Sequence, residues 1–439
     1  MKKRLLTLLL SVSMMFVMGG CSSSKGDDSK DKAKEVVTKV SEPLTIDFWH
    51  NMSGNQTPVL EGIVKNFNET VGKEKNITVN PVFQGSSKDL NSKVVGAIKS
   101  KQAPAVVLSM TNFVQDYMES ECVVDLKPYI TNSEVGMKDW EDIFESYRKE
   151  SESYSKPGVY SVPFAKYTEV LFYNQKFFEQ HNLTVPKTWE ELTEVSRKIT
   201  AITGKPAFGY DNLLNAFMTL TKQFGGDYTN NKGELLFADG NAAKEGLQMF
   251  QDNIKEGIWR VAGEDMFFSG PFANEVVQMY IGHTVESQYI NMKNPNIKWG
   301  AVEIPQKNAD KKFVVSSGNV LTALNQTENE EVSYASYEFI KFLLSKESNL
   351  TITTNTGYLP IRQSVLDSKE YKEFANSGKD ASKVSGPAQS DSFFFEPVFV
   401  ADTYSSSTVA TEVITMMNEV LVNKTAPEKA IEQLVSKLK

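Results

Sequence analysis

Residues 163–192 read PFAKYTEVLFYNQKFFEQHNLTVPKTWEEL. The run VLFY at 170–173 is apolar and rich in β-branched and aromatic side chains, which predicts a buried strand. Residues 176–180 then predict a helical turn. A second helix is expected to begin at Thr188, because Glu191 stands three residues later and completes a capping box. A strand followed closely by helices is typical of α/β proteins, so this stretch alone predicts one βα unit of such a fold.

The first third of the chain predicts the same alternation. Strands are expected at 44–49, 77–83 and 105–109, with helices at 56–68 and 89–99 between them. This order predicts a doubly wound lobe, in which ligands bind beyond the carboxyl ends of the strands. The residues that follow the three strands, and are therefore candidates for a binding site, are Trp49, His50, Asn51, Ser86, Ser87, Met110, Thr111 and Asn112.

Two of these candidates also have a purely structural explanation. Trp49 ends an apolar strand and is as well suited to core packing as to a ligand contact. His50 can donate a hydrogen bond to a polar ligand, or it can be satisfied by backbone groups at the strand end. The sequence leaves both alternatives open.

The first twenty residues have the pattern of a secretory signal peptide. Positions 2–4 are basic, and residues 5–18 form an apolar run that is too short for a comfortable membrane span. Two glycines precede Cys21, which resembles a bacterial lipobox. We therefore expect residues 1–20 to be a signal peptide, and residues 21–42 to be the lipidated Cys21 with a flexible, Ser-, Lys- and Asp-rich tether. An ordinary signal peptide followed by a chance cysteine is the alternative.

Composition argues against several classes of function. The chain has 439 residues, 40% of them hydrophobic, which leaves room for two ordinary domains after the tether. Its formal charge of −8 does not suit nucleic acid binding. Once Cys21 is assigned to the anchor, Cys122 stands alone beside two valines and is expected to be buried and inert. The three histidines, His50, His181 and His283, have no metal-ligand spacing, and no cofactor motif occurs in a supporting context.

Several motifs resemble those of the extracellular solute-binding proteins of ABC importers. The stretch at 163–192 is similar to that family's P-x-x-x-x-x-V-L-Y-Y-N-x-x-x-F segment followed by x-P-x-T-W-x-E-L. The similarity points to the branch that binds maltodextrins, other sugars and glycerol 3-phosphate. The F-W-H-x-M-x-G pattern at 48–54 and TGYLPI at 356–361 resemble the glycerol-3-phosphate binders in particular.

This resemblance implies a type II periplasmic-binding-protein-like fold, with two doubly wound α/β lobes joined by hinge crossings and a helical C-terminal region. The N-terminal lobe would comprise 43–166 and 319–357, and the C-terminal lobe 167–318 and 358–439. The first crossing would lie at 165–169, where it would form the bottom of the ligand cleft. The expected ligand-binding residues are Trp49, His50, Asn51, Ser87, Asn112, Lys166, Tyr167, His283, Thr284, Gly318 and Tyr358.

Two residues at the crossings keep a structural alternative. Lys166 beside the aromatic Tyr167 can hold an anion or a sugar hydroxyl, or it can be a solvated hinge lysine. Tyr358 can reach the cleft, or it can cover the third crossing as a capping aromatic.

The resemblance is weakest where it concerns the ligand. Where the glycerol-3-phosphate binders carry Tyr, Glu and Ser, this chain has Ser87, Asn112 and Tyr167. That family also carries a phosphate-binding Arg near its C-terminal helix, whereas residues 393–408 contain neither Arg nor Lys. A buried phosphate without its cation would be costly. We therefore expect a sugar or oligosaccharide as ligand, with glycerol 3-phosphate or a glycerophosphodiester as the alternative.

The resemblance also implies partners and location. The protein would be a monomeric binding protein without a cofactor, held at the extracellular face of the cell membrane by a lipid (palmitate) anchor on Cys21. It would deliver its ligand to an ABC permease. An enzyme is not expected, because no catalytic motif has a supporting context, and a surface glycosidase remains as the enzymatic alternative.

Overall fold

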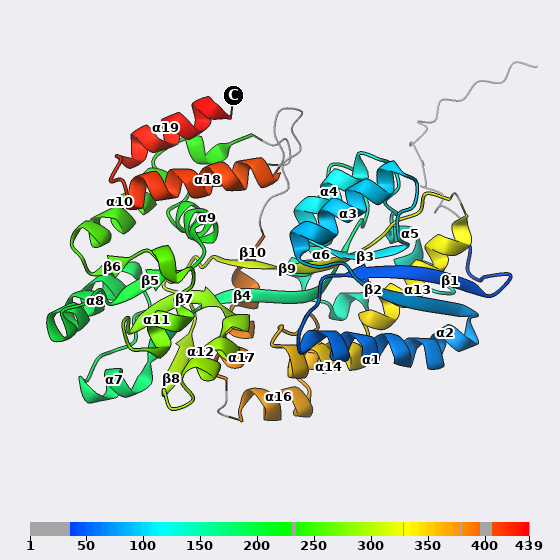
Figure 1. Ribbon diagram of the computed structural model, residues 1–439, viewed down its shortest axis with the longest axis horizontal. Helices are drawn as coiled ribbons and strands as arrows, with labels where there is room; N and C mark the ends of the chain where they lie inside the picture. Colours follow the sequence, from blue (N-terminus) through cyan, green and yellow to red (C-terminus); the bar gives the residue numbers. More distant parts are fainter. Residues whose placement is uncertain (1–35, 231–233, 328, 378–379, 396–405, 439) are drawn as a thin grey trace, which may run out of the picture. The chain divides into compact units, whose positions relative to one another are not determined.

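The computed structural model describes residues 36–230, 234–327, 329–377, 380–395 and 406–438 (Figure 1). These residues belong to one compact unit, Val36–Lys439. The expected signal peptide and the anchor at Cys21 lie outside the described residues. Among the described helices, none is long and apolar enough to cross a membrane.

The N-terminal part confirms the expected alternation of strands and helices. Its sheet is formed by β1 (Leu44–His50), β2 (Ile77–Phe83) and β3 (Val106–Ser109), which pair in parallel in the order β2-β1-β3. The connecting helices α1 (Gln56–Glu69) and α3 (Ser87–Lys99) lie on opposite sides of this sheet (Figure 1). Each helix buries an apolar stripe, because its apolar residues recur at helical spacing.

The C-terminal part is built in the same way. Strand β5 (Phe208–Tyr210) pairs in parallel with β6 (Trp259–Arg260) and with β7 (Met279–His283). The main helices around these strands are α8 (Trp189–Thr203), α9 (Leu213–Gln223) and α10 (Ala242–Lys255). Helix α8 begins at the predicted capping box of Thr188 and Glu191, and it ends at Gly204 in the left-handed conformation.

Two long strands connect the two parts. Strand β4 (Val162–Asn174) pairs antiparallel with β9 (Val314–Ala323), and the order β3-β9-β4-β7 makes the sheet continuous through them (Figure 1). The strand expected at 170–173 is therefore only the end of a longer one. Its residues 162–168, which include the expected crossing at 165–169 except Glu169, pair with β9. Residues 169–173 pair with β7, and residues 171–174 pair with β8 (Trp299–Val302). The crossing is extended because it is paired with β9 up to Thr168 and with β7 from Glu169.

The remaining elements complete the layers. In the first half of the described chain these are α2 (Val71–Glu74), α4 (Thr111–Met118), α5 (Lys127–Ile130), η1 (Trp140–Asp142), α6 (Glu145–Ser151), α7 (Gln175–Gln180) and η2 (Leu236–Ala238). In the second half they are η3 (Gly263–Asp265), α11 (Ser269–Ala273), η4 (Thr284–Glu286), α12 (Ser287–Lys293), α13 (Glu330–Leu343), α14 (Lys346–Thr356), α15 (Gln363–Leu366), α16 (Lys369–Ala375), α17 (Ser382–Ser385), η5 (Pro387–Ser392), β10 (Phe393–Phe394), α18 (Ser406–Leu421) and α19 (Pro427–Lys437).

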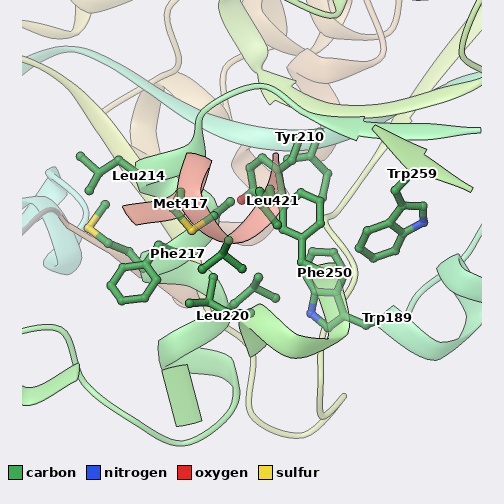
Figure 2. Packing of buried hydrophobic residues seen from close by; sticks show 14 of the residues in the cluster. Trp189, Tyr210, Leu214, Phe217, Leu220, Phe250, Trp259, Met417 and Leu421 are labelled. Carbon is green, nitrogen blue, oxygen red and sulfur yellow. The ribbon is translucent and has the colours of Figure 1, made fainter. Parts of the chain in front are cut away.

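Each half of the sheet has its own hydrophobic core. In the C-terminal core, Trp189 and Trp259 pack with Phe217 and Phe250, and α18 adds Met417 (Figure 2). The two indole N–H groups are satisfied, by Gln223 at 2.7 Å and by Ser196 at 2.9 Å. The apolar stripe of the C-terminal helices is thus core packing. Cys122 is buried and free, and burial raises the pKa of its thiol, which fits the expected inert role. The expected lobe boundaries stay a prediction.

Candidate functional site

Strand alternation separates Lys166 and Tyr167, the two adjacent residues of the crossing. Lys166 is paired with Gly318 and Tyr167 with Ser317 across the antiparallel strands β4 and β9. Successive side chains of a strand point to opposite faces of the sheet. The two residues therefore serve two different surroundings, although the sequence analysis treats them as neighbours in one cleft.

On its face, Lys166 is fully buried. Its Nζ lies 2.9 Å from Glu150 Oε1 of α6, and the same oxygen accepts a hydrogen bond from Thr111 at 2.9 Å. The Tyr147 ring lies 5.5 Å from the ammonium group. The structure thus corrects the picture of Lys166 as a free cation beside an aromatic or as a solvated hinge lysine, because its charge is already neutralised within the protein.

On the opposite face, Tyr167 meets two other predicted site residues. Its ring centroid lies 4.8 Å from that of His283 and 6.4 Å from that of Tyr358, to which it is nearly parallel. The three residues come from β4, the end of β7 and the segment after α14. All three are only half-buried, so two aromatic faces and an imidazole are gathered at one place. Aromatic faces with adjacent polar groups are typical of small-molecule sites.

A row of polar side chains joins the end of β1, the start of α3 and the middle of β9. Asn51, directly after β1, donates to Ser87 Oγ at 2.6 Å, and Asn319 of β9 donates to Asn51 Oδ1 at 3.1 Å. Asn51 and Ser87 were expected in the site, whereas Asn319 was missed. Asn319 shares a face of β9 with Ser317, and Ser317 is the cross-strand partner of Tyr167. This pairing is the signal that places Asn319 on the same face as Tyr167.

Gly318 is required by the close approach of β9 to β4. Its φ of +122° is rarely adopted by other residues, and an added Cβ would overlap the carbonyl oxygen of Ala165. Asn112 lies near it, in the first turn of α4. Both line a cavity of about 20 Å³ with Met110, Glu150 and Ser316.

Trp49 and His50 lie within the N-terminal part rather than with Tyr167. Trp49 is half-buried and packs against the cluster that contains Leu90 and Val107. His50 is 1% exposed, between the rings of Phe48 and Phe83 at 5.7 and 5.9 Å. Burial lowers the pKa of His50, so its imidazole is neutral at pH 7.

Thr284 follows His283 in the chain and, unlike His283, is fully buried. Its carbonyl oxygen accepts hydrogen bonds from Ser382 at 3.2 Å and from the Lys383 ammonium at 3.3 Å. Lys383 also donates to the carbonyl oxygen of Gly357 at 2.6 Å. One buried lysine therefore ties the backbone beside Tyr358 to the backbone beside His283.

An acidic cluster beneath His283 was not expected from the sequence. Glu169 is buried and accepts hydrogen bonds from Tyr210 at 2.6 Å and from Asn215 at 3.1 Å. Burial raises the pKa of Glu169 to about 7, and the nearby His283 partly opposes this shift. The sequence contains only a weak signal that Glu169 lies near the site. Tyr167 and Glu169 are two residues apart on a strand, so their side chains share a face.

Two further carboxyl groups stand behind Gly282. A Cβ added to this glycine would lie 2.5 Å from Glu286 Oε2 and 3.1 Å from Asp211 Oδ2, so these two oxygens face the same small space. Burial and the charge of Glu286 raise the pKa of Asp211, and burial raises that of Glu286. Each of these two carboxyl groups therefore holds its proton more tightly than a solvent-exposed carboxyl group does.

The face that carries Lys166 borders a larger cavity of about 690 Å³. Phe393, Phe394 and Phe395 line it together with Glu150 and Tyr154. Among the described residues, no group of three or more His, Cys, Asp or Glu side chains is arranged to hold a metal ion.

Comparison with known proteins gives a consistent result. The family described as "Bacterial extracellular solute-binding protein" matches residues 62–377. The sn-glycerol-3-phosphate-binding periplasmic protein UgpB of Rhizobium meliloti is 23% identical over 359 residues, which are 76% of this chain and 77% of that protein.

Two solved structures have the same fold. A cyclic α-maltosyl-1,6-maltose binding protein from Arthrobacter globiformis gives a TM-score of 0.77 at 18% identity, and the match covers 90% of this chain and 99% of the other. UgpB from Mycobacterium tuberculosis in complex with glycerophosphocholine gives 0.74 at 19% identity, with 90% and 97% covered.

Proposed function

This chain belongs to the bacterial extracellular solute-binding proteins, and we propose that it is the lipid-anchored member of an ABC importer that captures a sugar or oligosaccharide. The ligand would lie against Tyr167, Tyr358 and His283. The row Asn51–Ser87–Asn319 would supply hydrogen bonds to its hydroxyl groups.

One observation carries the choice of a neutral ligand. The surroundings of His283 hold three buried carboxyl groups, those of Glu169, Asp211 and Glu286. Lys166 and Lys383, which lie next to the proposed contacts in the chain or in space, are engaged, Lys166 with Glu150 and Lys383 with two backbone carbonyls. Such a site suits hydroxyl groups better than a phosphate, because carboxyl groups and engaged lysines leave an anion without a matching cation.

The mechanism follows from the two connecting strands. We infer that 43–166 with 319–357 and 167–318 with 358–439 act as two lobes that close around the ligand by bending at β4, β9 and the segment at Tyr358. Tyr167 lies at this junction, so ligand contact and closure are coupled. The closed form would present its surface to the permease, and an ATPase on another chain would supply the energy.

The remaining parts of the proposal concern location and partners. We propose acylation of Cys21, residence at the extracellular face of the cell membrane, a monomeric state, and no catalytic activity or cofactor. The pattern of the first twenty residues and the tether after Cys21 support the anchor.

A phosphorylated ligand is the second candidate. The similarity to a glycerol-3-phosphate binder over three quarters of the chain favours it, as does TGYLPI at 356–361. In this case a glycerol phosphate or a glycerophosphodiester would occupy the same face of β4.

A thermal-shift screen of the protein without residues 1–35 tests the proposal. A ligand at one hundred times its Kd stabilises the folded state by about 2.7 kcal/mol, which raises the melting temperature by several degrees. We expect a shift with maltotriose or another sugar, and no shift with glycerol 3-phosphate. A shift with phosphates alone would support the second candidate, and turnover of a chromogenic glycoside would contradict both.

The variant Tyr167→Ala links the screen to the site. We expect it to weaken binding of the identified ligand by about tenfold, because an aromatic contact and its buried area are lost. Phe267→Ala is the matched control, because Phe267 is 56% exposed and the substitution removes an aromatic ring from the surface. Equal affinity of Tyr167→Ala and the unaltered protein would remove Tyr167 from the site.

A further inference from the structure

Glu169 and His283 are cross-strand partners. They lie directly opposite each other in the antiparallel pair of β4 and β7, so their side chains share the face on which Tyr167 stands. His283 Nε2 is 3.9 Å from Glu169 Oε1, and Asn215 Nδ2 lies within 3.3 Å of both atoms. The Glu169 side chain is 1% exposed and the His283 side chain is 19% exposed, so the imidazole is the more exposed group of the pair.

The turn that follows His283 places a carboxyl group beside its ring. Glu286 Oε1 accepts a hydrogen bond from the His283 backbone N–H at 2.9 Å and lies 3.3 Å from His283 Nδ1. Burial lowers the pKa of His283, while the charges of Glu169 and Asp211 partly oppose this shift.

The groups around this pair leave its charge uncompensated. Asp211 and Glu286 add only carboxyl groups to these surroundings, and Lys383 lies 3.6 Å from Asp380. The titratable and charged groups around the pair are Tyr167 on β4, Tyr210 and Asp211 at the end of β5, Glu286 on η4, Tyr358 after α14, and Asp380 and Lys383 at α17. A proton on Glu169 or His283 therefore changes the net charge below Tyr167 by one unit.

We propose that Glu169 and His283 hold a single exchangeable proton beneath Tyr167, and that this proton decides which charge of ligand group the site accepts. With the proton present, an anionic group is tolerated; without it, the site accepts only neutral groups. The inference rests on the proposed function, because it takes Tyr167 and His283 as ligand contacts.

The direction of the effect follows from Glu169. Burial raises its pKa to about 7, so the pair gains its proton as the pH falls through neutrality. For one linked proton, the affinity for a monoanion falls by about tenfold between pH 6 and pH 8. The affinity for a neutral sugar stays within about twofold.

Calorimetric titration with two probes tests the linkage. Glycerophosphoglycerol is a phosphodiester whose charge is constant over this range, and maltotriose is neutral. We expect any binding of the diester to be about tenfold tighter at pH 6 than at pH 8, and Glu169→Gln to abolish this pH dependence. Glu338→Gln is the matched control, because Glu338 is a buried carboxylate that lies 3.6 Å from Lys75 in the N-terminal part. A diester affinity that is equal at both pH values, or a pH dependence that persists in Glu169→Gln, would overturn the proposal.

NMR of the ligand-free protein tests the proton separately. The chain has only three histidines, and His283→Asn assigns the signal of interest. The His283 ring resonances are expected to show an inflection near pH 7 that is absent in Glu169→Gln. If neither probe binds at either pH, the ligand half of the inference falls with the proposed function, and this titration still decides whether the proton is there. Resonances that do not move between pH 5.5 and pH 8.5 would overturn the proton pair even if a sugar binds.

Discussion

At the scale of single residues, neighbours in the sequence have opposite roles. Lys166 is buried and ion-paired with Glu150, whereas Tyr167 stands with His283 and Tyr358 on the other face of the strand. A sequence motif gives their order but not the face of each. The face of the strand on which a residue lies therefore predicts its contacts better than its residue type does.

The buried pair of Lys166 and Glu150 leads to a stability prediction. Lys166→Met removes the only ion-pair partner that the described residues give to Glu150, so the carboxylate is left buried without compensation. We expect a loss of about 3–5 kcal/mol in the free energy of unfolding, measured by urea denaturation. The double variant Lys166→Met/Glu150→Gln is expected to recover most of this loss, because no isolated charge remains. A double variant no more stable than Lys166→Met would contradict the interpretation.

At the scale of elements, β4 and β9 decide how the two parts are connected. Their close approach depends on Gly318, where the backbone of Ala165 leaves no room for a side chain. The sequence marks Gly318 as a candidate ligand contact but does not identify the strand that it approaches, because the antiparallel pairing between β4 and β9 joins residues about 150 positions apart.

Gly318 can be compared with a second glycine of positive φ. Gly225, after α9, has φ +98° and no atom within 4 Å of an added Cβ, so Gly225→Ala carries only backbone strain of about 1–2 kcal/mol. Gly318→Ala adds steric overlap with β4, and we expect it to cost about 2 kcal/mol more. Chemical denaturation of both variants measures the difference. Equal losses would show that the strands separate easily at this point.

At the scale of the whole molecule, the acidic cluster links stability to pH. Burial raises the pKa of Glu169 from 4.5 to about 7, so the folded protein binds this proton more tightly than the unfolded chain. The stability that this group contributes is fully present below pH 4.5 and is lost as the pH rises through 7. The loss amounts to about 3 kcal/mol for this shift. We expect Glu169→Gln to flatten the stability profile between pH 5 and pH 8, and an unchanged difference between the two proteins over this range would contradict the assignment.

The sequence by itself determined the elements and the class of the protein. Periodicity and capping residues predicted β1, α1, β2, α3, β3 and α8 almost to their ends, because these signals act within one or two turns of chain. The motif at 163–192 pointed to the solute-binding family, which the match over residues 62–377 establishes.

Only the tertiary structure decided which residues share a face of the connecting strands. Strand pairing brought Glu169 opposite His283 and placed Asn319 beside Asn51, and it buried Lys166 against α6. These contacts join segments from about 16 to 270 residues apart, and their charge depends on burial. Local sequence signals carry neither the pairing partner nor the degree of burial, and for this reason the acidic cluster beneath the site became visible only in the folded chain.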